Sequence, residues 1–363
     1  MSDDPVRVVV VGATGNIGVA LTRRLAASPR VGSVLGLARR VPDGPPADVP
    51  NPARIGYARL DITDDAAEPE LAEVFAGADA VVHLAALFQP SHRPRTTWRT
   101  NCVGAARVFR AVAAAGVPAL VHASSLVAYS PAPRDDRRVD ESWPTHGWPT
   151  AAYPREKAYA ERLLDAFEPR HPDVRVVRMR PAVVVTGESA PQQRRLFGGP
   201  LFPARRPPRP LRLFPDVPGL RFQVVHADDV AEAFHQAVVA PVAGAFNLAA
   251  EPVVDPVLLA ELDGGRAVRV PRRALRAGVA AGWGLRLVPT SPSMLDAVLR
   301  FPLLDAGRAH RELRWAPRRS AQEAVTDFLA GLRHGAGGDT PPLRRRVPGG
   351  RLREAAAGVG ERP

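Results

Sequence analysis

The feature that most limits the fold is a glycine-rich turn near the N-terminus. A valine-rich, strand-sized run, Val6–Val11, leads directly into Gly12, Gly15 and Gly18, and an apolar helical segment, Val19–Leu25, follows. Glycines let a backbone turn sharply and approach a pyrophosphate, while a helix N-terminus offers free N–H groups and the positive end of its dipole. A strand, a glycine turn and a helix in this order predict a dinucleotide-binding βαβ unit.

Similar valine- and leucine-rich runs recur along the first half of the chain, separated by segments long enough for helices. They are Val34–Ala38, Ala80–Leu84, Ala119–Ala123 and Val174–Met179, with a further strand ending near Asp61 and Ile62. Near-continuous apolar strands indicate burial on both faces. The pattern predicts an α/β fold: a Rossmann-like, doubly wound parallel sheet with a smaller C-terminal substrate-binding domain.

The change of pattern after Arg180 suggests how the chain is divided. We expect residues 1–180 to form the NAD(P)-binding domain, with 221–249 as a segment that could return to it. Residues 181–333 are expected to bind substrate, and Gly198–Gly219, crowded with proline and arginine, to be an irregular loop. The Gly-, Pro- and Arg-rich residues 334–363 are typical of a disordered tail.

The charge and the cysteine content exclude several classes of protein. A net charge of +12 would suit a nucleic-acid-binding protein. The arginines are spread out, however, without the interleaved aromatic residues of a base-stacking surface, so we expect no nucleic-acid partner. No apolar stretch is long enough to span a membrane, and Cys102 is the only cysteine. We therefore expect no membrane partner, no disulfide, no metal site and a cytoplasmic location.

One lysine stands out in an arginine-rich chain. Lysine and arginine total 49, yet Lys157 is the only lysine, and it follows Tyr153 by four residues. Pro154 suits the first position of a helix that would run to Phe167, and residues four apart share one helix face. The pKa of a free tyrosine is about 10, and a nearby ammonium, helped by an oxidised nicotinamide, would lower it. The pair predicts proton transfer at a substrate oxygen, with Tyr153 as general acid/base.

Several motifs together resemble one family. The glycine spacing, the Tyr153–Lys157 pair and Ser125, four residues before Tyr129, resemble the extended short-chain dehydrogenase/reductase family, also called the NAD-dependent epimerase/dehydratase family. The resemblance covers roughly residues 6–250 well and 251–333 loosely. It implies a Rossmann-fold, nucleotide-binding enzyme in which Ser125, Tyr153 and Lys157 form the catalytic triad and Ser125 holds the substrate oxygen.

The resemblance also implies residues around the cofactor and the substrate. The cofactor set is Gly12, Thr14, Gly15, Asn16, Ile17, Gly18, Arg39, Arg40, Asp61, Ile62, Leu84, Ala85, Ala86, Asn101 and Lys157; the substrate set is Ser124, Ser125, Phe88 and Pro181. No acid ends the second strand, where Arg39 and Arg40 follow instead. Because arginine pairs well with a phosphate, NADP is favoured as cofactor, and NAD is possible.

The motifs leave more than one reaction open. Ser124 and Ser125 stand where the family's 4,6-dehydratases carry acids, and the apolar run Pro181–Val185 stands where nucleotide-sugar epimerases usually carry an asparagine. These features resemble the hydroxysteroid-dehydrogenase and dihydroflavonol-reductase relatives. They favour an oxidoreductase that reduces a ketone or aldehyde, or oxidises a secondary alcohol.

Two alternatives remain. A nucleotide-sugar epimerase is one, because arginines between Arg194 and Arg212 could bind a diphosphate. A non-catalytic NADP-binding sensor is the other. Each reading implies a small-molecule substrate or ligand, and the resemblance implies that a homodimer could form.

Overall fold

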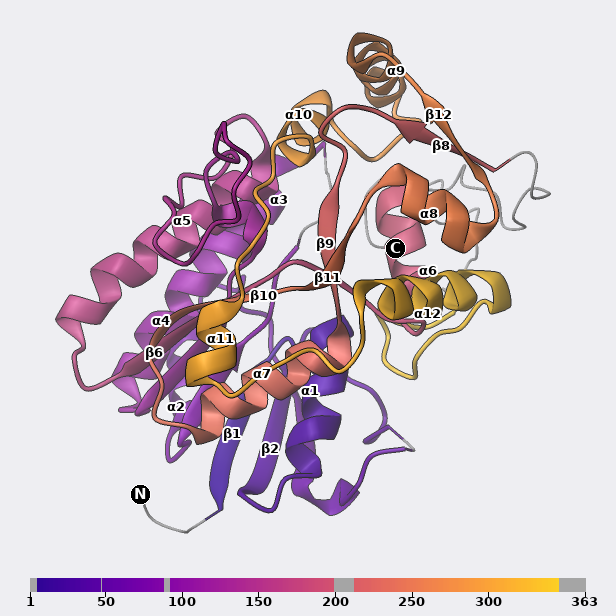
Figure 1. Cartoon of the computed structure of the whole chain (residues 1–363). Helices are drawn as coiled ribbons and strands as arrows, with labels where there is room; N and C mark the ends of the chain where they lie inside the picture. The colour runs from indigo at the N-terminus through magenta and orange to yellow at the C-terminus, as the bar shows by residue number, and fades with distance from the viewer. Residues whose placement is uncertain (1–4, 47, 88–91, 199–211, 346–363) are drawn as a thin grey trace.

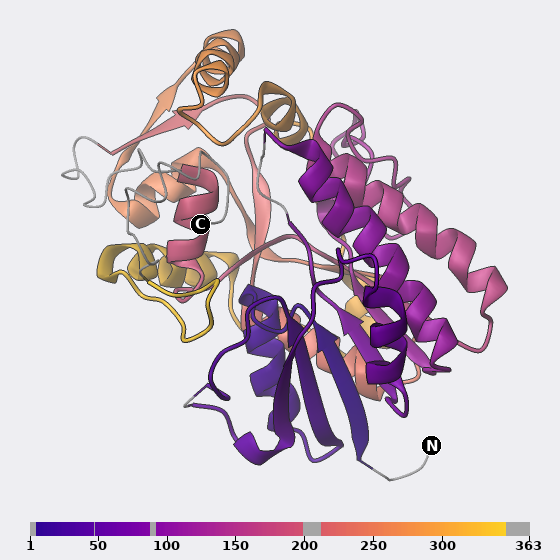
Figure 2. The same ribbon diagram turned by 180° about the vertical axis from the view of Figure 1, so that it is seen from behind.

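The computed structural model describes residues 5–46, 48–87, 92–198 and 212–345. The chain forms a large parallel sheet with helices on both faces, and a smaller part that lies beyond one end of the strands (Figure 1). The view from behind shows the same two parts, with the smaller one at the upper left (Figure 2).

The large sheet contains seven strands. They are β1 (Val6–Val11), β2 (Val31–Ala38), β3 (Ile55–Arg59), β4 (Ala80–His83), β5 (Ala119–Ala123), β6 (Arg175–Pro181) and β10 (Gly244–Leu248). Their order is β10-β6-β5-β4-β1-β2-β3, and every neighbouring pair is parallel. The predicted doubly wound, Rossmann-like α/β fold is confirmed. The carboxyl ends of the strands face the smaller part, which is where such sheets bind ligands.

Alternate residues of the strands serve two separate cores, as the two-residue period of a strand requires. Val8 and Val10 lie in the core beneath α1 (Asn16–Ala26) and α7 (Ala227–Val239). Val9 and Val11 lie in the opposite core. That face is covered by α2 (Ala67–Phe75), α4 (Ala105–Ala114) and α5 (Ala152–Phe167).

The smaller part is built from two short sheets and several helices. Its strands are β7 (Val183–Val185), β9 (Phe222–His226) and β11 (Ala250–Val254) in one sheet, and β8 (Leu213–Asp216) and β12 (Arg266–Arg269) in the other. Its helices are α6 (Ala190–Gln193), α8 (Pro256–Asp263), α9 (Arg272–Gly284), α10 (Pro292–Val298) and α12 (Ala321–His334). None of the helices in the described ranges is long and apolar enough to cross a membrane.

The remaining elements are short. Two further helices, α3 (Pro94–Trp98) and α11 (Gly307–Glu312), lie outside the regular β–α alternation. Single turns of 3-10 helix span Pro52–Arg54, Leu126–Ala128 and Glu168–Arg170, and π-helical turns span Arg99–Gly104 and Arg194–Gly198. The π-helical turn Arg99–Gly104 leads directly into α4.

The segment 221–249 is shared between the two parts. Strand β9 belongs to the sheet formed with β7 and β11, whereas α7 packs against α1, and β10 adds the edge strand next to β6. After β9 the chain therefore returns to the large sheet through α7 and β10.

The structure differs from the sequence-based expectation in the Gly198–Gly219 region. Within it, Leu213–Asp216 forms β8 and pairs in parallel with Arg266–Arg269. The proline and arginine content of the segment predicted a loop. The strand depends on hydrogen bonds to a partner strand that lies far along the chain, which the local sequence does not reveal. Residues 199–211 lie outside the described residues.

Candidate active site

The glycine turn after β1 is shaped by two close backbone contacts. Gly12 has a φ of 93°, and a Cβ on it would lie 2.6 Å from the Ala85 nitrogen. A Cβ on Gly18 would lie 2.4 Å from the Gly12 carbonyl oxygen. On Gly15, by contrast, the nearest atom would be the same oxygen at 3.7 Å. Packing therefore requires the first and third glycines, while the second faces open space.

The N-terminus of α1 presents its backbone to that open space. Gly15 is the N-cap residue; no side chain caps the helix, and no acid lies in its first turn. The first backbone N–H groups of a helix have no intrahelical acceptor, so they can bind an anion. The Asn16 side chain donates to the Val184 carbonyl at 3.2 Å, which ties α1 to β7. Thr14 is buried, and Ile17 packs against the core.

The cofactor residues expected after β2, β3 and β4 lie at the same edge of the sheet as this turn, because the carboxyl ends of its parallel strands meet there. Arg39 and Arg40 are exposed where β2 ends. Asp61 accepts hydrogen bonds from the backbone N–H of Thr63 at 3.0 Å and from its hydroxyl at 2.8 Å. Leu84, Ala85 and Ala86 follow β4 and are partly buried, and Ile62 is buried. Phe88, expected at the substrate, lies outside the described residues.

Tyr153 lies inside α5 rather than before it. The helix begins at Ala152, so Tyr153 and Lys157 both belong to it and keep the four-residue spacing. This corrects the expectation that Pro154 opens the helix. Proline at the third helical position costs no hydrogen bond, because the first N–H groups of a helix have no acceptor within it.

The structure brings Ser125, Tyr153 and Lys157 together where β5 ends. The hydroxyls of Ser125 and Tyr153 share a hydrogen bond. Lys157 Nζ lies 5.8 Å from the centroid of the Tyr153 ring and donates a 2.6 Å hydrogen bond to the Ala123 carbonyl. Burial lowers the pKa of Lys157 to about 8, against the opposing charge of Glu161. A single bond to a strand carbonyl thus fixes the ammonium next to the phenol.

The pKa of Tyr153 does not move in the direction expected from Lys157. Burial raises it, the charge of Glu156 raises it further, and the hydrogen bond from Ser125 opposes both. The protein's own groups therefore keep the phenol protonated at neutral pH. The sequence-based estimate counted the ammonium and left out the loss of water around the phenol, which favours the neutral form.

Two polar residues expected to contact ligands have partners within the protein. Ser124 is buried and donates to a Glu161 carboxylate oxygen at 2.6 Å. The Asn101 side chain accepts from the Leu87 N–H at 2.7 Å, and donates to the Leu87 carbonyl at 2.6 Å and to Glu156 at 2.7 Å. In the structure both side chains therefore fix neighbouring segments of the protein: Ser124 binds to α5, and Asn101 binds to α5 and to the backbone of Leu87. Pro181 is buried at the end of β6.

Sequence reasoning missed Glu156 and Glu161, two fully buried acids on α5. Glu156 accepts from the Thr97 hydroxyl at 2.6 Å as well as from Asn101. Glu161 accepts from Arg180 at 2.9 and 3.0 Å and from Arg178 at 3.0 Å. The burial of Glu161 could have been predicted from the sequence. Glu161 follows Lys157 by four residues, so the two side chains lie on the same, inward-facing side of the helix.

The segment after α12 lies against the glycine turn. Thr340 is buried and its hydroxyl donates to the Thr14 carbonyl at 2.9 Å, and Leu343 is buried nearby. Residues 335–345 therefore differ from the disordered tail expected over 334–363. The reason is a small apolar and polar anchor, Thr340 and Leu343, within a Gly- and Arg-rich stretch. Residues 346–363 lie outside the described residues.

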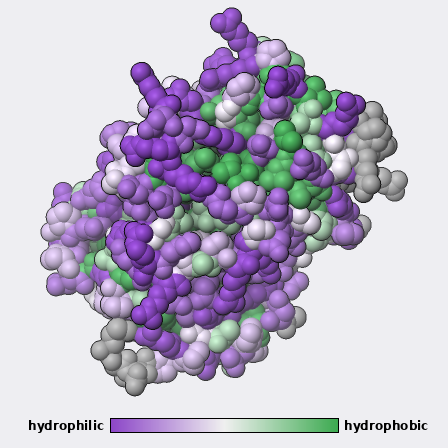
Figure 3. Space-filling model, in the orientation of Figure 1, coloured by the Kyte–Doolittle hydropathy of each residue, from purple (hydrophilic) through white to green (hydrophobic). Residues whose placement is uncertain are grey.

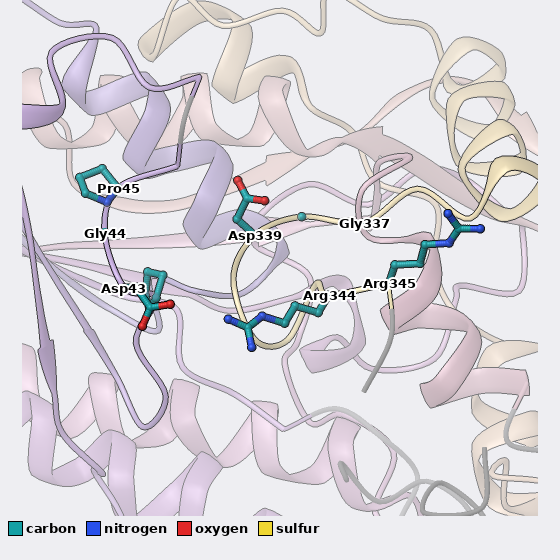
Figure 4. A pocket seen from close by; sticks show the side chains of 9 residues that line it. Asp43, Gly44, Pro45, Gly337, Asp339, Arg344 and Arg345 are labelled. Carbon is teal, nitrogen blue, oxygen red and sulfur yellow. The ribbon is translucent and has the colours of Figure 1, made fainter. Parts of the chain in front are cut away.

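This segment and the loop after β2 border an open pocket of about 860 Å³. Figure 4 shows Asp43 and Pro45 on one wall and Asp339 and Arg344 on the other, with Arg344 directed toward Asp43. Arg345 points away from that wall and lies beside Gly335, at the C-terminal end of α12. The pocket is bordered by the residues that follow Arg39 and Arg40. No set of three His, Cys, Asp or Glu side chains that could bind a metal ion is found in the described residues.

Comparison with known proteins gives concordant results. A model of the "NAD dependent epimerase/dehydratase family" matches residues 8–249. An uncharacterized protein of Mycobacterium tuberculosis is 27% identical over 342 residues, which cover 90% of this chain and 84% of that protein.

Solved structures share the fold. UDP-glucuronic acid 4-epimerase of Bacillus cereus, in complex with UDP-glucuronic acid and NAD, has a TM-score of 0.66 at 16% identity, over 90% of this chain and 99% of that one. UDP-glucose 4-epimerase of Thermotoga maritima, with UDP-glucose, has a TM-score of 0.67 at 17% identity, with the same coverage. The dTDP-glucose 4,6-dehydratase DesIV of Streptomyces venezuelae, with NAD bound, has a TM-score of 0.64 at 20% identity, over 90% and 97%.

Proposed function

This chain belongs to the NAD-dependent epimerase/dehydratase family, and we propose that it is an oxidoreductase that reduces a ketone or aldehyde, or oxidises the corresponding secondary alcohol. The observation that carries this proposal is the cluster of Ser125, Tyr153 and Lys157 at the carboxyl end of β5. The reaction needs a hydride donor or acceptor beside a group that moves a proton at oxygen.

The residues around the glycine turn fit a nicotinamide dinucleotide. Gly15 leaves open space beside an uncapped helix N-terminus, which suits a pyrophosphate. When bound, the cofactor supplies the hydride. The protein would hold it through the backbone at Gly12–Gly18, and Arg39, with Arg40 beside it, would contact a 2′-phosphate. We therefore propose NADP as the cofactor, although solved relatives contain NAD.

The proposed proton chemistry follows from the pKa directions. Because burial keeps Tyr153 protonated, the phenol can donate its proton to the oxygen of a carbonyl substrate. Ser125 would hold that oxygen through a hydrogen bond. Lys157, held by the Ala123 carbonyl, would stabilise the phenolate that is left once the proton has moved. These roles suit reduction at neutral pH.

A nucleotide-sugar epimerase is the second candidate. It is favoured by the solved relatives, which include epimerases in complex with UDP-sugars. Just after Arg180, where the family's epimerases usually carry an asparagine, the described residues Val183–Val185 are apolar and form the strand β7 beside β9. This apolar strand supports the reductase over the epimerase. A sensor without catalysis is less consistent with the Tyr153–Ser125 contact.

A labelled cofactor distinguishes these functions. We expect NADPH carrying deuterium at its transferable position to deliver the label to the alcohol product from at least one member of a panel of ketones and aldehydes. Inversion of a UDP-sugar with no net oxidation of the cofactor would replace the proposal with the epimerase. Binding without turnover on either panel would indicate the sensor. More efficient use of deuterated NADH than of NADPH would contradict the NADP assignment alone.

A pair of glycine substitutions tests the dinucleotide site. Gly15→Ala is expected to melt at the wild-type temperature, since its methyl group meets no atom closer than 3.7 Å, yet to bind NADPH at least about tenfold more weakly. Gly18→Ala, the matched control, is expected to lose about 1–3 kcal/mol of stability, because its methyl would lie 2.4 Å from a carbonyl oxygen. Thermal melts and NADPH fluorescence titrations measure both. Unchanged NADPH affinity in Gly15→Ala would remove the turn from the cofactor site.

A further inference from the structure

Helix α9 protrudes from the smaller part and buries none of its residues. Figures 1 and 2 both show it at the outer end of the molecule, next to the β8–β12 sheet. Leu275 and Val279 contact the small core formed with α10. A helix of 13 residues is marginally stable by itself in water and usually depends on packing along one face. The small packed face of α9 is therefore unusual for a helix of this length.

Exposed apolar side chains concentrate in this region. Leu213 is 61% exposed on β8, Val268 41% on β12, and Leu285 and Leu287, just after α9, are 70% and 44% exposed. Figure 3 shows hydrophobic surface gathered over the upper part of the molecule, where Figure 1 places α8, α9 and α10. We call Leu213, Val268, Leu285 and Leu287, with the arginines between them, the basic-apolar face.

Positive charge predominates on this face, although Asp216 on β8 stands opposite Arg269. Residues 264–295 contain no Asp or Glu and six arginines, all exposed: Arg266, Arg269, Arg272, Arg273, Arg276 and Arg286. Arg272 and Arg276 pair with Asp296 at 3.3 and 2.9 Å. Among the described residues, no ion pair involves the other four. Arginines in the first turn of α9 also lie at the positive end of its dipole, which an anion would relieve.

The face is joined to the segment that follows β4 by one contact between rings. The rings of Trp283, on α9, and His92, on the segment between β4 and α3, stack with centroids 3.6 Å apart and an angle of 16° between the planes. An occupant of the basic-apolar face would therefore contact the side of the molecule toward which the strands' carboxyl ends open.

We propose that the basic-apolar face docks the protein on an anionic phospholipid surface, independently of which reaction the active site performs. Leucines and a tryptophan beside arginines suit the interface, where apolar side chains enter the acyl boundary and guanidinium groups meet phosphates. A nucleic acid would leave the leucines without a partner. A second copy in an isologous dimer would set the arginines against themselves. This contact with a membrane surface departs from the sequence-based expectation of no membrane partner.

The test uses the full chain and two kinds of vesicle, one of phosphatidylcholine alone and one of equal parts phosphatidylcholine and phosphatidylglycerol, in a flotation assay. The protein is expected to float with the anionic vesicles only. Arg273→Gln should weaken this binding about fivefold, while Arg170→Gln, which removes one exposed charge elsewhere, should leave it unchanged. Leu287→Asp should weaken it at least as much, and Tyr159→Asp, at a 42% exposed site on α5, should not.

Three results would overturn the proposal. The first is no flotation with either vesicle, and the second is equal flotation with both. The third is equal loss in Arg273→Gln and Arg170→Gln, which would reduce the effect to net charge. Concentration-dependent self-association that Leu287→Asp abolishes, without vesicle binding, would assign the face to a second copy instead. All four substituted side chains are exposed or project from the surface, so the variants are expected to fold.

Discussion

Replacing Tyr153 with phenylalanine is expected to lower kcat for carbonyl reduction about 10²–10⁴-fold, the usual contribution of a positioned general acid. The change deletes one hydroxyl, which shares a hydrogen bond with Ser125, and keeps the aromatic ring that packs against the core. NADPH affinity and the melting temperature should stay close to those of the wild type. Single-turnover rates with NADPH and the best carbonyl substrate, alongside fluorescence titration of NADPH, measure the two quantities separately.

Tyr159→Phe is the matched control for this experiment. Tyr159 lies on the same helix, is 42% exposed, and contacts Trp98 with ring centroids 4.8 Å apart. Loss of its hydroxyl should leave kcat unchanged. If Tyr153→Phe keeps kcat within about tenfold of the wild type, another group donates the proton, and the proposed mechanism is wrong. If it loses NADPH binding in parallel, Tyr153 has a structural role.

The fold was predictable from the sequence because its signals are local. A valine-rich run such as Val6–Val11 fills two cores, so it shows no alternation of apolar and polar residues, and the glycine turn follows it directly. Strand β8 had no such signal. Its four residues contain proline and aspartate, and its register with Arg266–Arg269 depends on a partner about 50 residues away in the sequence.

The same distinction applies to the candidate site. The Tyr153–Lys157 spacing is a helical i,i+4 pair and can be read from five residues. The resemblance selected Ser125 over Ser124 from its spacing to Tyr129, but the sequence did not show that Ser124 is held by Glu161, 37 residues further on. The Thr340–Thr14 contact joins residues 326 apart. The pKa of Tyr153 depends on burial, which neighbouring residues in the sequence do not reveal.

Glu161→Gln is expected to reduce the free energy of unfolding by about 3–5 kcal/mol, the usual cost of removing one partner from a buried ion pair. The carboxylate is fully buried and accepts hydrogen bonds from Arg180, Arg178 and Ser124. An amide at this position would remove the buried ion-pair partner of Arg180, whereas Arg178 would keep its ion pairs with Asp165 and Glu168. Chemical denaturation of the wild type and the variant measures the difference.

Glu68→Gln is the matched control, because it makes the same chemical change in an ion pair at an exposed position. Glu68 also pairs with an arginine, Arg110, but both side chains are well exposed to solvent. Solvent screening limits such a pair to about 0–1 kcal/mol. A loss in Glu161→Gln no larger than that in Glu68→Gln would mean that the buried network contributes little to stability. Glu161→Gln should also lower kcat, because Glu161 accepts the hydrogen bond of Ser124, and Ser124 directly precedes Ser125.

The pH dependence of this difference has a definite sign. Arg180, Ser124 and Arg178 outweigh the effect of burial and lower the pKa of Glu161 to about 2, from an ordinary value of 4.5. A carboxylate with a lowered folded-state pKa stabilises the protein above its unfolded pKa, and loses that contribution as the pH falls toward the folded value. The gap in stability between wild type and Glu161→Gln should therefore be constant above about pH 4.5 and close as the pH falls toward 2. Protonated Glu161 and glutamine are both neutral, so a gap that stayed constant through this window would show that charge is not what Glu161 contributes.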